Sequence, residues 1–241
     1  MTTAEAFQRA RRPEQKQQRQ AAILGAAREL ALRDGVRNVS LTDIAARIGI
    51  HKSALLRYFE TREQIFLELT AAAWRDWARA LHAGLDAAAP GSAAVVADVF
   101  ARSFGDRPLF CDLLAHTPLN LERNVSPEAV RRYKLTSLGV VDEAAALVQR
   151  TLSTLTLAEA REFVATLASL AGSLWQIANP APALAELYAS DPALAQACVD
   201  LTPRLRRTAE ILLAGLIPSR NQGQGDQGQS SCRVQADPAR R

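Results

Sequence analysis

The chain has 241 residues, of which 48% are apolar, and its formal net charge is +4. This length and composition supply enough apolar surface for a hydrophobic core and argue against a disordered chain. The sequence contains no run of about 18 uncharged apolar residues, and its polar N-terminus lacks the apolar core of a signal peptide, so we expect a cytoplasmic protein with no membrane partner.

Motifs for common enzyme and metal chemistry are missing from the sequence. The three cysteines, Cys111, Cys198 and Cys232, are far apart and form no C-x-x-C motif, so neither a disulfide framework nor a zinc site is predicted. The chain also lacks the H-E-x-x-H and G-x-S-x-G motifs, a phosphate-binding glycine loop and a dinucleotide fingerprint. We therefore do not expect an enzyme, and we predict no catalytic residue, no metal ion and no cofactor.

The charge is concentrated at one end of the chain. Residues 1–62 contain twelve Lys and Arg against six Asp and Glu, a net charge of +6, which leaves −2 for the remaining residues. A small basic segment joined to a nearly neutral one points to a polyanion bound at the basic end.

The first residues predict a flexible arm followed by one helix. Residues 1–15 are polar and basic without apolar periodicity, which predicts a flexible arm that either touches DNA or is a disordered leader. From Gln15 to Asp34, apolar residues recur at helical spacing, and Gly35 supplies the stop signal.

The next segment predicts a helix-turn-helix. Ser40 and Asp43 form a capping-box pattern that opens a short helix, which ends near Gly49. A second short helix is predicted from about Lys52 to Phe59, and another begins at Thr61. Two short helices joined by a glycine turn are typical of a helix-turn-helix.

The rest of the chain predicts a helical body, because no segment shows the period-two alternation of a strand. Caps at Ser126, Thr156 and Asp191 open three of its helices. After Leu216 the sequence becomes rich in Gly, Gln, Ser and Arg, which predicts a disordered tail over residues 218–241. The candidate helices are Arg62–Ala88, Ser92–Phe104, Arg107–Ala115, Pro127–Thr151, Leu157–Ala178 and Pro192–Leu216.

Residues 40–66, SLTDIAARIGIHKSALLRYFETREQIF, resemble the DNA-binding head of the tetracycline-repressor (TetR) family. A second segment, FCDLLAHTPLNLERNVSPEAV at residues 110–130, is similar, more loosely, to ligand-binding domains of that family. The first resemblance rests on Ile44-Ala45 in the capped helix, Gly49 and Ile50 at the turn, Leu55, the aromatic pair Tyr58-Phe59, and Arg62-Glu63 before Phe66.

The resemblance implies an all-α fold. A three-helix helix-turn-helix DNA-binding domain over residues 16–62 would be followed by a helical-bundle domain over residues 63–217 that binds a ligand and dimerises. It implies a sequence-specific transcriptional regulator, with repression as the family's usual behaviour, that binds a palindromic operator as a homodimer. Release would follow binding of a small, largely apolar effector. The expected partners are double-stranded DNA, that effector and a second copy of the chain.

The candidate DNA-contacting residues lie at the starts of the two short helices and along the second one. His51 and Leu56 depart from the family pattern, in which a serine and an aromatic residue are commoner. Ser40 could be a simple cap, and Arg62, at the place of the family's phosphate-anchoring lysine, could instead pair with Glu63 or Glu60. The candidates are Ser40, Thr42, His51, Lys52, Ser53, Leu56, Arg57, Tyr58 and Arg62.

The candidate ligand-binding residues belong to the middle helices. An apolar stripe at helical spacing is more often ordinary core than a pocket, and the polar groups of residues 116–126 could instead cap helices or pair with one another. The candidates are Trp74, Trp77, Phe100, Phe104, Leu113, His116, Asn120, Tyr133 and Trp175, with Leu114 and Leu138 as further linings.

The last two long helices carry more apolar surface than a chain-terminal layer needs. We expect Leu157–Ala178 and the helix that ends at Leu216 to form a four-helix interface with a second copy. The alternative is that these faces are buried within one subunit. A ligand-independent architectural DNA binder is the alternative function, and its body would need no cavity.

Overall fold

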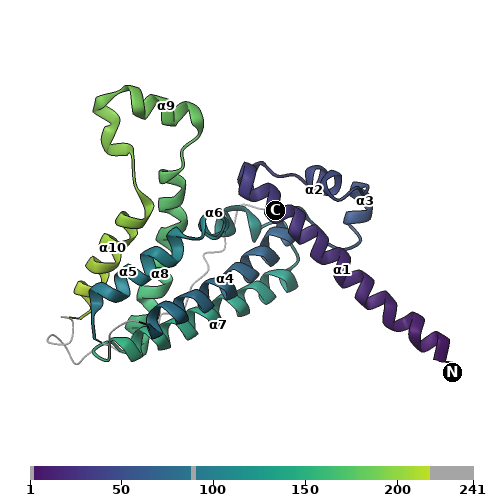
Figure 1. Ribbon diagram of the computed structural model, residues 1–241, viewed down its shortest axis with the longest axis horizontal. Helices are drawn as coiled ribbons and strands as arrows, with labels where there is room; N and C mark the ends of the chain where they lie inside the picture. Colours follow the sequence, from purple (N-terminus) through teal and green to yellow (C-terminus); the bar gives the residue numbers. More distant parts are fainter. Residues whose placement is uncertain (1–2, 88–90, 218–241) are drawn as a thin grey trace, which may run out of the picture.

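The computed structural model describes residues 3–87 and 91–217. Within these two ranges the chain is helical apart from short connections and contains no strand, which confirms the all-α prediction. A small head at the N-terminal end is joined to a larger body by one long helix, α4 (Arg62–Asp86) (Figure 1). The predicted tail, residues 218–241, lies outside the described residues.

The head is built from three α-helices, a 3₁₀ turn and the start of α4. Each of its three α-helices contributes a fully buried side chain, Ile23, Ile44 and Leu55, and Phe59 is buried with them. These residues belong to a hydrophobic core that continues into the body. Its elements are α1 (Thr3–Asp34), η1 (Val36–Asn38), α2 (Leu41–Arg47) and α3 (Lys52–Leu55).

Gly49 makes the turn between α2 and α3. Its φ is +67°, a left-handed conformation that a residue with a Cβ adopts only with strain. The chain closes the turn with a hydrogen bond from Ile50 N to Ala45 O at 3.0 Å. This geometry confirms the predicted helix-turn-helix.

Two elements of the head differ in length from the prediction. The first helix begins at Thr3, where a flexible arm was expected up to residue 15, because Ala, Glu, Gln and Arg favour a helix even without an apolar face. The second helix of the motif ends at Leu55, where Phe59 was expected. After Leu55 the chain forms tighter turns: Tyr58 N donates a hydrogen bond at 2.9 Å to Leu55 O, three residues earlier, where an α-helix would bond four residues earlier.

The body contains the remaining elements. α4 packs along α7, α6 packs on α8, and α5 packs against α10 (Figure 1). The backbones of α6 and α8 approach closely at Gly172, where a Cβ would lie 2.7 Å from Ala115 N. Besides α4, the elements are α5 (Ala93–Gly105), α6 (Pro108–His116), the π-helical turn η2 (Thr117–Leu121), α7 (Pro127–Thr151), α8 (Leu157–Ala178), α9 (Pro182–Ser190), the 3₁₀ helix η3 (Pro192–Ala197) and α10 (Leu201–Leu216).

The region after α8 also differs from the prediction. One helix was expected over Pro192–Leu216, but the structure has η3 and α10 there, and an additional helix, α9, precedes them. The reason is Pro203, which lies in the first turn of α10. Proline is tolerated in a first turn, where the backbone N–H has no helical partner, but it would interrupt a continuous helix.

The aromatic residues expected to line a ligand cavity pack mainly on one another. Trp77 stacks on Phe104 with ring centroids 5.0 Å apart, and it meets Trp74 edge to face at 5.5 Å. Phe100 contacts Phe163 of α8 at 5.0 Å. These rings therefore form the core of the body, which was the alternative to a ligand pocket for this apolar stripe.

Candidate nucleic-acid interface and body grooves

The N-terminus of α2 is organised by the predicted capping box. Ser40 Oγ accepts a hydrogen bond from Asp43 N at 3.3 Å, and Asp43 Oδ2 accepts one from Ser40 N at 2.8 Å. The hydroxyl of Ser40 also donates to Asp43 at 2.6 Å, and these bonds lower the pKa of that carboxyl. Ser40 is therefore a cap first, while Thr42, one residue into the helix, is exposed and free to face a phosphate.

α3 is capped by an unexpected side chain. His51 is the N-cap residue, and its Nδ1 accepts a hydrogen bond from Ser53 N at 3.3 Å and lies 2.9 Å from Ser53 Oγ. A ring nitrogen thus takes the place of the serine oxygen that the family usually has there. The departure from the family pattern preserves the cap.

The other candidates on and after α3 form an outward-facing set. Lys52, Ser53 and Arg57 are exposed, Leu56 has an exposed fraction of 43%, and Tyr58 is half-buried against the head core. Since Leu55 anchors the same helix in the core, this set can meet a groove of DNA only from the opposite side.

Arg62 is the exception among the candidates. Its guanidinium donates to Val36 O and to Val39 O, pairs with Glu63 at 3.3 Å and lies 4.5 Å above the ring of Phe66. The side chain is only 19% exposed. We therefore interpret Arg62 as an internal brace of the η1 turn rather than as a phosphate anchor.

A buried carboxylate joins the head to the body. Asp112 of α6 accepts a hydrogen bond from Val36 N of η1 at 2.7 Å and another from Gln176 Nε2 of α8 at 2.8 Å. Burial tends to raise the pKa of Asp112, but hydrogen bonds from His116 and from Val36 outweigh it and leave the pKa lowered. One side chain thus ties the head to two helices of the body.

Two polar candidates of the predicted ligand site, His116 and Asn120, lie beside this junction, and a third, Tyr133, is bonded within the body. His116 Nε2 lies 3.4 Å from Asp112 Oδ1, and its Nδ1 lies 3.4 Å from Asn120 Nδ2. Tyr133 accepts a hydrogen bond from Trp74 Nε1 at 3.3 Å. These groups pair with one another, which agrees with the alternative that the sequence left open.

Three other linings also lie apart from a common pocket. Leu138 of α7 is 59% exposed and faces solvent. Leu114 and Trp175 are half-buried at the edge of the core.

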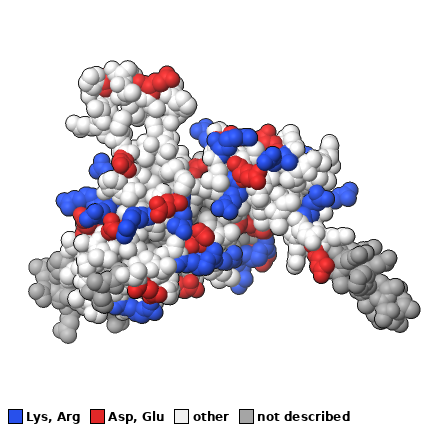
Figure 2. All heavy atoms as spheres, viewed as in Figure 1, with Lys and Arg blue, Asp and Glu red and all other residues white. Residues whose placement is uncertain are grey.

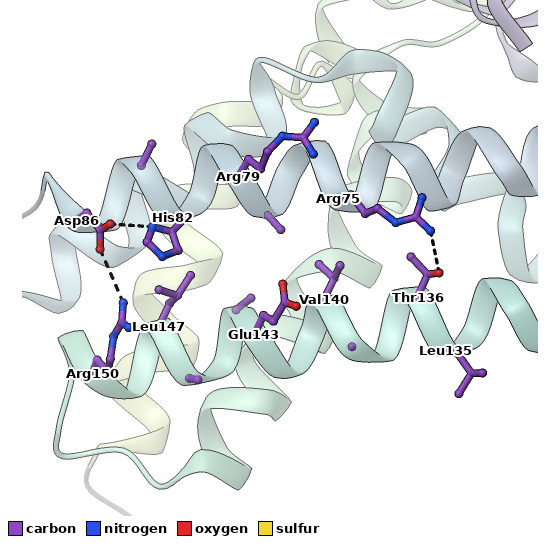
Figure 3. Close-up of a pocket in the computed structure, with 15 residues that line it drawn as sticks. Arg75, Arg79, His82, Asp86, Leu135, Thr136, Val140, Glu143, Leu147 and Arg150 are labelled. Atoms are coloured by element: carbon purple, nitrogen blue, oxygen red, sulfur yellow. Dashed lines mark hydrogen bonds and ion pairs between the residues drawn. The ribbon is translucent and has the colours of Figure 1, made fainter. Parts of the chain in front are cut away.

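A groove lies on the outside of the body between α4 and α7, and it encloses about 1040 Å³ (Figure 3). Its floor is apolar, with Val140 and Leu147 among the lining residues. Charged side chains edge it: Arg75 reaches Thr136 Oγ1 at 3.2 Å, Arg79 pairs with Asp76 at 3.1 Å, and Arg150 and His82 both meet Asp86. In Figure 2 basic side chains lie over this part of the body, with acidic ones among them.

Neither the groove nor the junction was predicted from the sequence. The groove could have been suspected from the i, i+4 spacing of Arg75 and Arg79 along α4, and the junction from Asp112, an acid inside the apolar run that begins at Phe110. Neither signal identifies its partners, which lie on other helices.

A second groove, of about 710 Å³, lies between α1, α4 and α6, where the head meets the body. Leu24 and Leu32 of α1 and Leu109 and Phe110 of α6 line it. The head and the body are therefore not closely packed along their whole contact.

A capped helix-turn-helix with an exposed basic second helix, carried on an all-helical body, defines a DNA-binding transcriptional regulator. A family model described as "Bacterial regulatory proteins, tetR family" matches residues 23–69, and one described as "Tetracyclin repressor-like, C-terminal domain" matches residues 71–220. The chain belongs to the TetR family. A comparison with curated protein sequences found no match.

Solved structures share the fold at low sequence identity. FadR from Bacillus subtilis, in complex with stearoyl-CoA, is 15% identical with a TM-score of 0.54, and the match covers 81% of this chain and 98% of that one. A TetR-family regulatory protein from Rhodococcus RHA1 is 16% identical with a TM-score of 0.53, over 82% and 96%. A TetR/AcrR-family regulator from Thermobifida fusca is 20% identical with a TM-score of 0.50, over 82% and 98%.

Two further observations concern the described residues alone. Among them, no helix is long and apolar enough to cross a membrane. The same residues contain no cluster of three or more His, Cys, Asp and Glu side chains that could hold a metal ion.

Proposed function

We propose that the protein is a homodimeric repressor that binds a palindromic operator through its heads and is released by a small effector bound to the body. The observation that carries the DNA-binding part is the position of Lys52, Ser53 and Arg57, which are exposed around a helix whose other side is anchored by Leu55. N-terminal residues of such a helix face base edges in the major groove, and basic side chains contact phosphates.

A single head is too small to give high specificity, so the proposal includes two heads on a symmetric dimer that read successive turns of DNA. Thr42, His51, Leu56 and Tyr58 complete the proposed contact surface. Ser40 contributes through the cap, and Arg62 through the shape of the η1 turn. A DNA target inside the cell agrees with a cytoplasmic location.

The DNA-binding proposal is tested by selecting bound duplexes from a random DNA pool with the purified full chain. We expect one palindromic sequence, and we expect the double variant Arg57→Ala, Tyr58→Ala to lose it. Arg123→Ala, which removes an exposed arginine from the body, is the matched control and should recover the same sequence. Selection of no preferred sequence by the wild-type chain would reject operator recognition.

For the effector, the structure favours the α4–α7 groove over the aromatic core. A volume of about 1040 Å³ is ample for a drug-sized molecule. The groove combines an apolar floor with a charged edge on which Arg75, Arg79 and Arg150 outnumber two carboxylates, Asp86 and Glu143, and this suits an apolar chain that ends in an anionic group. The relative from B. subtilis is a complex with stearoyl-CoA, a molecule of that chemistry. The proposed effector therefore carries an anionic group in addition to the largely apolar part that the family resemblance implied.

The groove is well placed to control the head, because α4 forms one of its walls and begins in the head at Arg62. A molecule that separates α4 from α7 would tilt α4 and change the spacing of the two heads on DNA. Asp112 would resist that movement by holding η1 to α6. A coupling of about 1–3 kcal/mol between effector and DNA is typical of such regulators.

The effector proposal is tested with stearoyl-CoA as the probe. We expect it to bind the full chain, to release the selected operator, and to do both less well after Arg75→Ala and Arg79→Ala together. Arg131→Ala on α7 is the control, because Arg131 is exposed and does not line the groove. Equal loss of binding in the control would place the ligand elsewhere, and operator release without any groove dependence would reject this site.

A further inference from the structure

Residues 180–200 form an extension that projects from the body between α8 and α10 (Figure 1). It contains α9 and η3, which pack mainly on each other. None of its residues is buried. Leu184 and Leu187 of α9 have exposed fractions of 39% and 47%.

The helix α9 is too short to be stable on its own in water. α9 has nine residues, and isolated helices shorter than about 12 residues are marginal, since most helical stability in proteins comes from packing an apolar face. Among the residues that the structure describes, α9 packs mainly on η3, and its two leucines stay exposed. Packing of the apolar face of α9 on a further surface would therefore stabilise this helix.

The extension carries few charges, and all of them are negative. It contains three acidic residues, Glu186, Asp191 and Asp200, no Lys or Arg, and is otherwise dominated by Ala, Pro and Leu. In Figure 2 its surface is uncharged apart from acidic side chains. Protein interfaces are likewise depleted of charged residues at their centre.

The exposed apolar surface continues onto the two helices that flank the extension. Ile177 at the end of α8 is 50% exposed, and Ile211 of α10 is 56% exposed. A small groove of about 210 Å³ between these helices is lined by Phe163 and Leu212, among others. Half of the large exposed apolar side chains in the described part of the chain lie between Leu157 and Ile211.

Charge and apolar content together favour a second copy of the chain as the partner. The extension carries −3, whereas α10 carries Arg204, Arg206 and Arg207 against Glu210, a net charge of +2. In a two-fold dimer that packs α8 and α10 together, the extension of one subunit and α10 of the other would attract each other. The C-terminal tail, residues 218–241, also carries a net charge of +2, but it is a poorer partner because it contains a single large aliphatic residue, Val234, to cover the apolar face of α9.

We propose that the extension is an intersubunit clasp: the apolar face of α9, with Leu184 and Leu187, docks on the α8–α10 surface of a second copy of the chain. The two-fold symmetry makes the exchange reciprocal, so each subunit both gives and receives one extension. This inference rests on the homodimer of the proposed function and adds the segment that stabilises it.

The first measurement is the dimer dissociation constant of the full chain, obtained by sedimentation equilibrium over a range of concentrations. We expect Leu184→Ser and Leu187→Ser together to raise it at least tenfold. The matched control is Leu135→Ser and Leu138→Ser on α7, which removes two leucines of 57% and 59% exposure and should leave the dissociation constant unchanged. Circular dichroism verifies that each variant keeps its helix content.

The second measurement identifies the partner directly. Leu187 is replaced by photoreactive p-benzoylphenylalanine in a mixture of 15N-labelled and unlabelled chains, and the crosslinks are assigned by mass spectrometry. We expect crosslinks from position 187 to α8 or α10 of a chain with the other label. The same replacement at Leu135 serves as the control and should give no such crosslinks.

The outcomes separate the clasp from the dimer. A dimer whose dissociation constant is unaffected by the α9 variant, with crosslinks confined to one chain, overturns the clasp and leaves the homodimer standing. A wild-type chain that is monomeric at every concentration overturns both. Crosslinks to the tail of the same chain would show that residues 218–241 cover α9 instead, and would also overturn the clasp.

Discussion

The head and the body are stabilised in different ways. The head is specified locally: its short helices begin at caps formed within three residues, such as Ser40 with Asp43 and His51 with Ser53, and a few buried aliphatic residues complete it. The body is specified by distant contacts, with Trp77 at the centre of rings that come from three helices. Local motifs therefore predict the head well, while the body depends on which side chains meet in three dimensions.

The largest expected effect is at the centre of the body. Trp77 is fully buried and donates a hydrogen bond to Ser103 Oγ at 2.9 Å, so Trp77→Ala should lower the free energy of unfolding by about 3–5 kcal/mol. Leu135→Ala, at a position 57% exposed, should change it by less than about 0.5 kcal/mol. Urea unfolding measures both, and similar losses for the two variants would contradict a body held by its aromatic core.

The next effect sharpens the contrast at the junction of the two regions. Asp112→Ala leaves the buried N–H of Val36 without its acceptor and should reduce the free energy of unfolding by about 1–3 kcal/mol. Asp142→Ala is the control, because it breaks the exposed ion pair with Arg161, which is worth less than about 1 kcal/mol. If the two variants were equally stable, Asp112 would not be a structural tie.

The pH dependence of stability follows from the same carboxylate. The pKa of Asp112 is lowered in the folded protein, so its contribution to stability is present above the ordinary aspartate pKa and is lost as the pH falls through the folded value. We expect this loss at acidic pH in the wild type and a flatter profile for Asp112→Asn, both measured by unfolding at a series of pH values. His116, which faces the carboxylate, and the adjacent Cys111 are retained in both proteins. Parallel profiles would show that other carboxyl groups dominate.

A smaller effect tests the local specification of the head. His51→Ala removes the α3 cap and should reduce the free energy of unfolding by about 1 kcal/mol, measured by urea unfolding, and it should also weaken operator binding. His51→Ser restores an oxygen cap and should recover the stability. Failure of serine to recover it would mean that the ring of His51 acts through a contact other than the cap.

The smallest effect on stability is expected on the outer side of the head. Arg57→Ala should leave the free energy of unfolding within about 0.5 kcal/mol of wild type, since the side chain is exposed. It should nevertheless reduce the slope of operator affinity against salt concentration by about one unit on logarithmic axes. An unchanged salt slope would remove Arg57 from the phosphate contacts.

Much of the candidate DNA interface was predictable from sequence, because its chemistry is local. Capping requires only the spacing of Ser40 and Asp43, and a glycine at position 49 suits the left-handed turn. The role of Arg62 was not predictable in the same way. Its partners Val36 and Val39 lie more than twenty residues earlier and reach it only after the head has folded.

The all-helical class, the helix-turn-helix and most helix starts follow from the amino-acid sequence alone, since caps, prolines and apolar periodicity act over a few residues. The three-dimensional packing of the helices was needed to establish that most of the predicted cavity aromatics pack on one another, that Asp112 reaches Val36 across 76 residues, and that an open groove lies between α4 and α7. The same packing shows that residues 180–200 project from the body. These features depend on the relative positions of whole helices, which short-range sequence patterns do not encode.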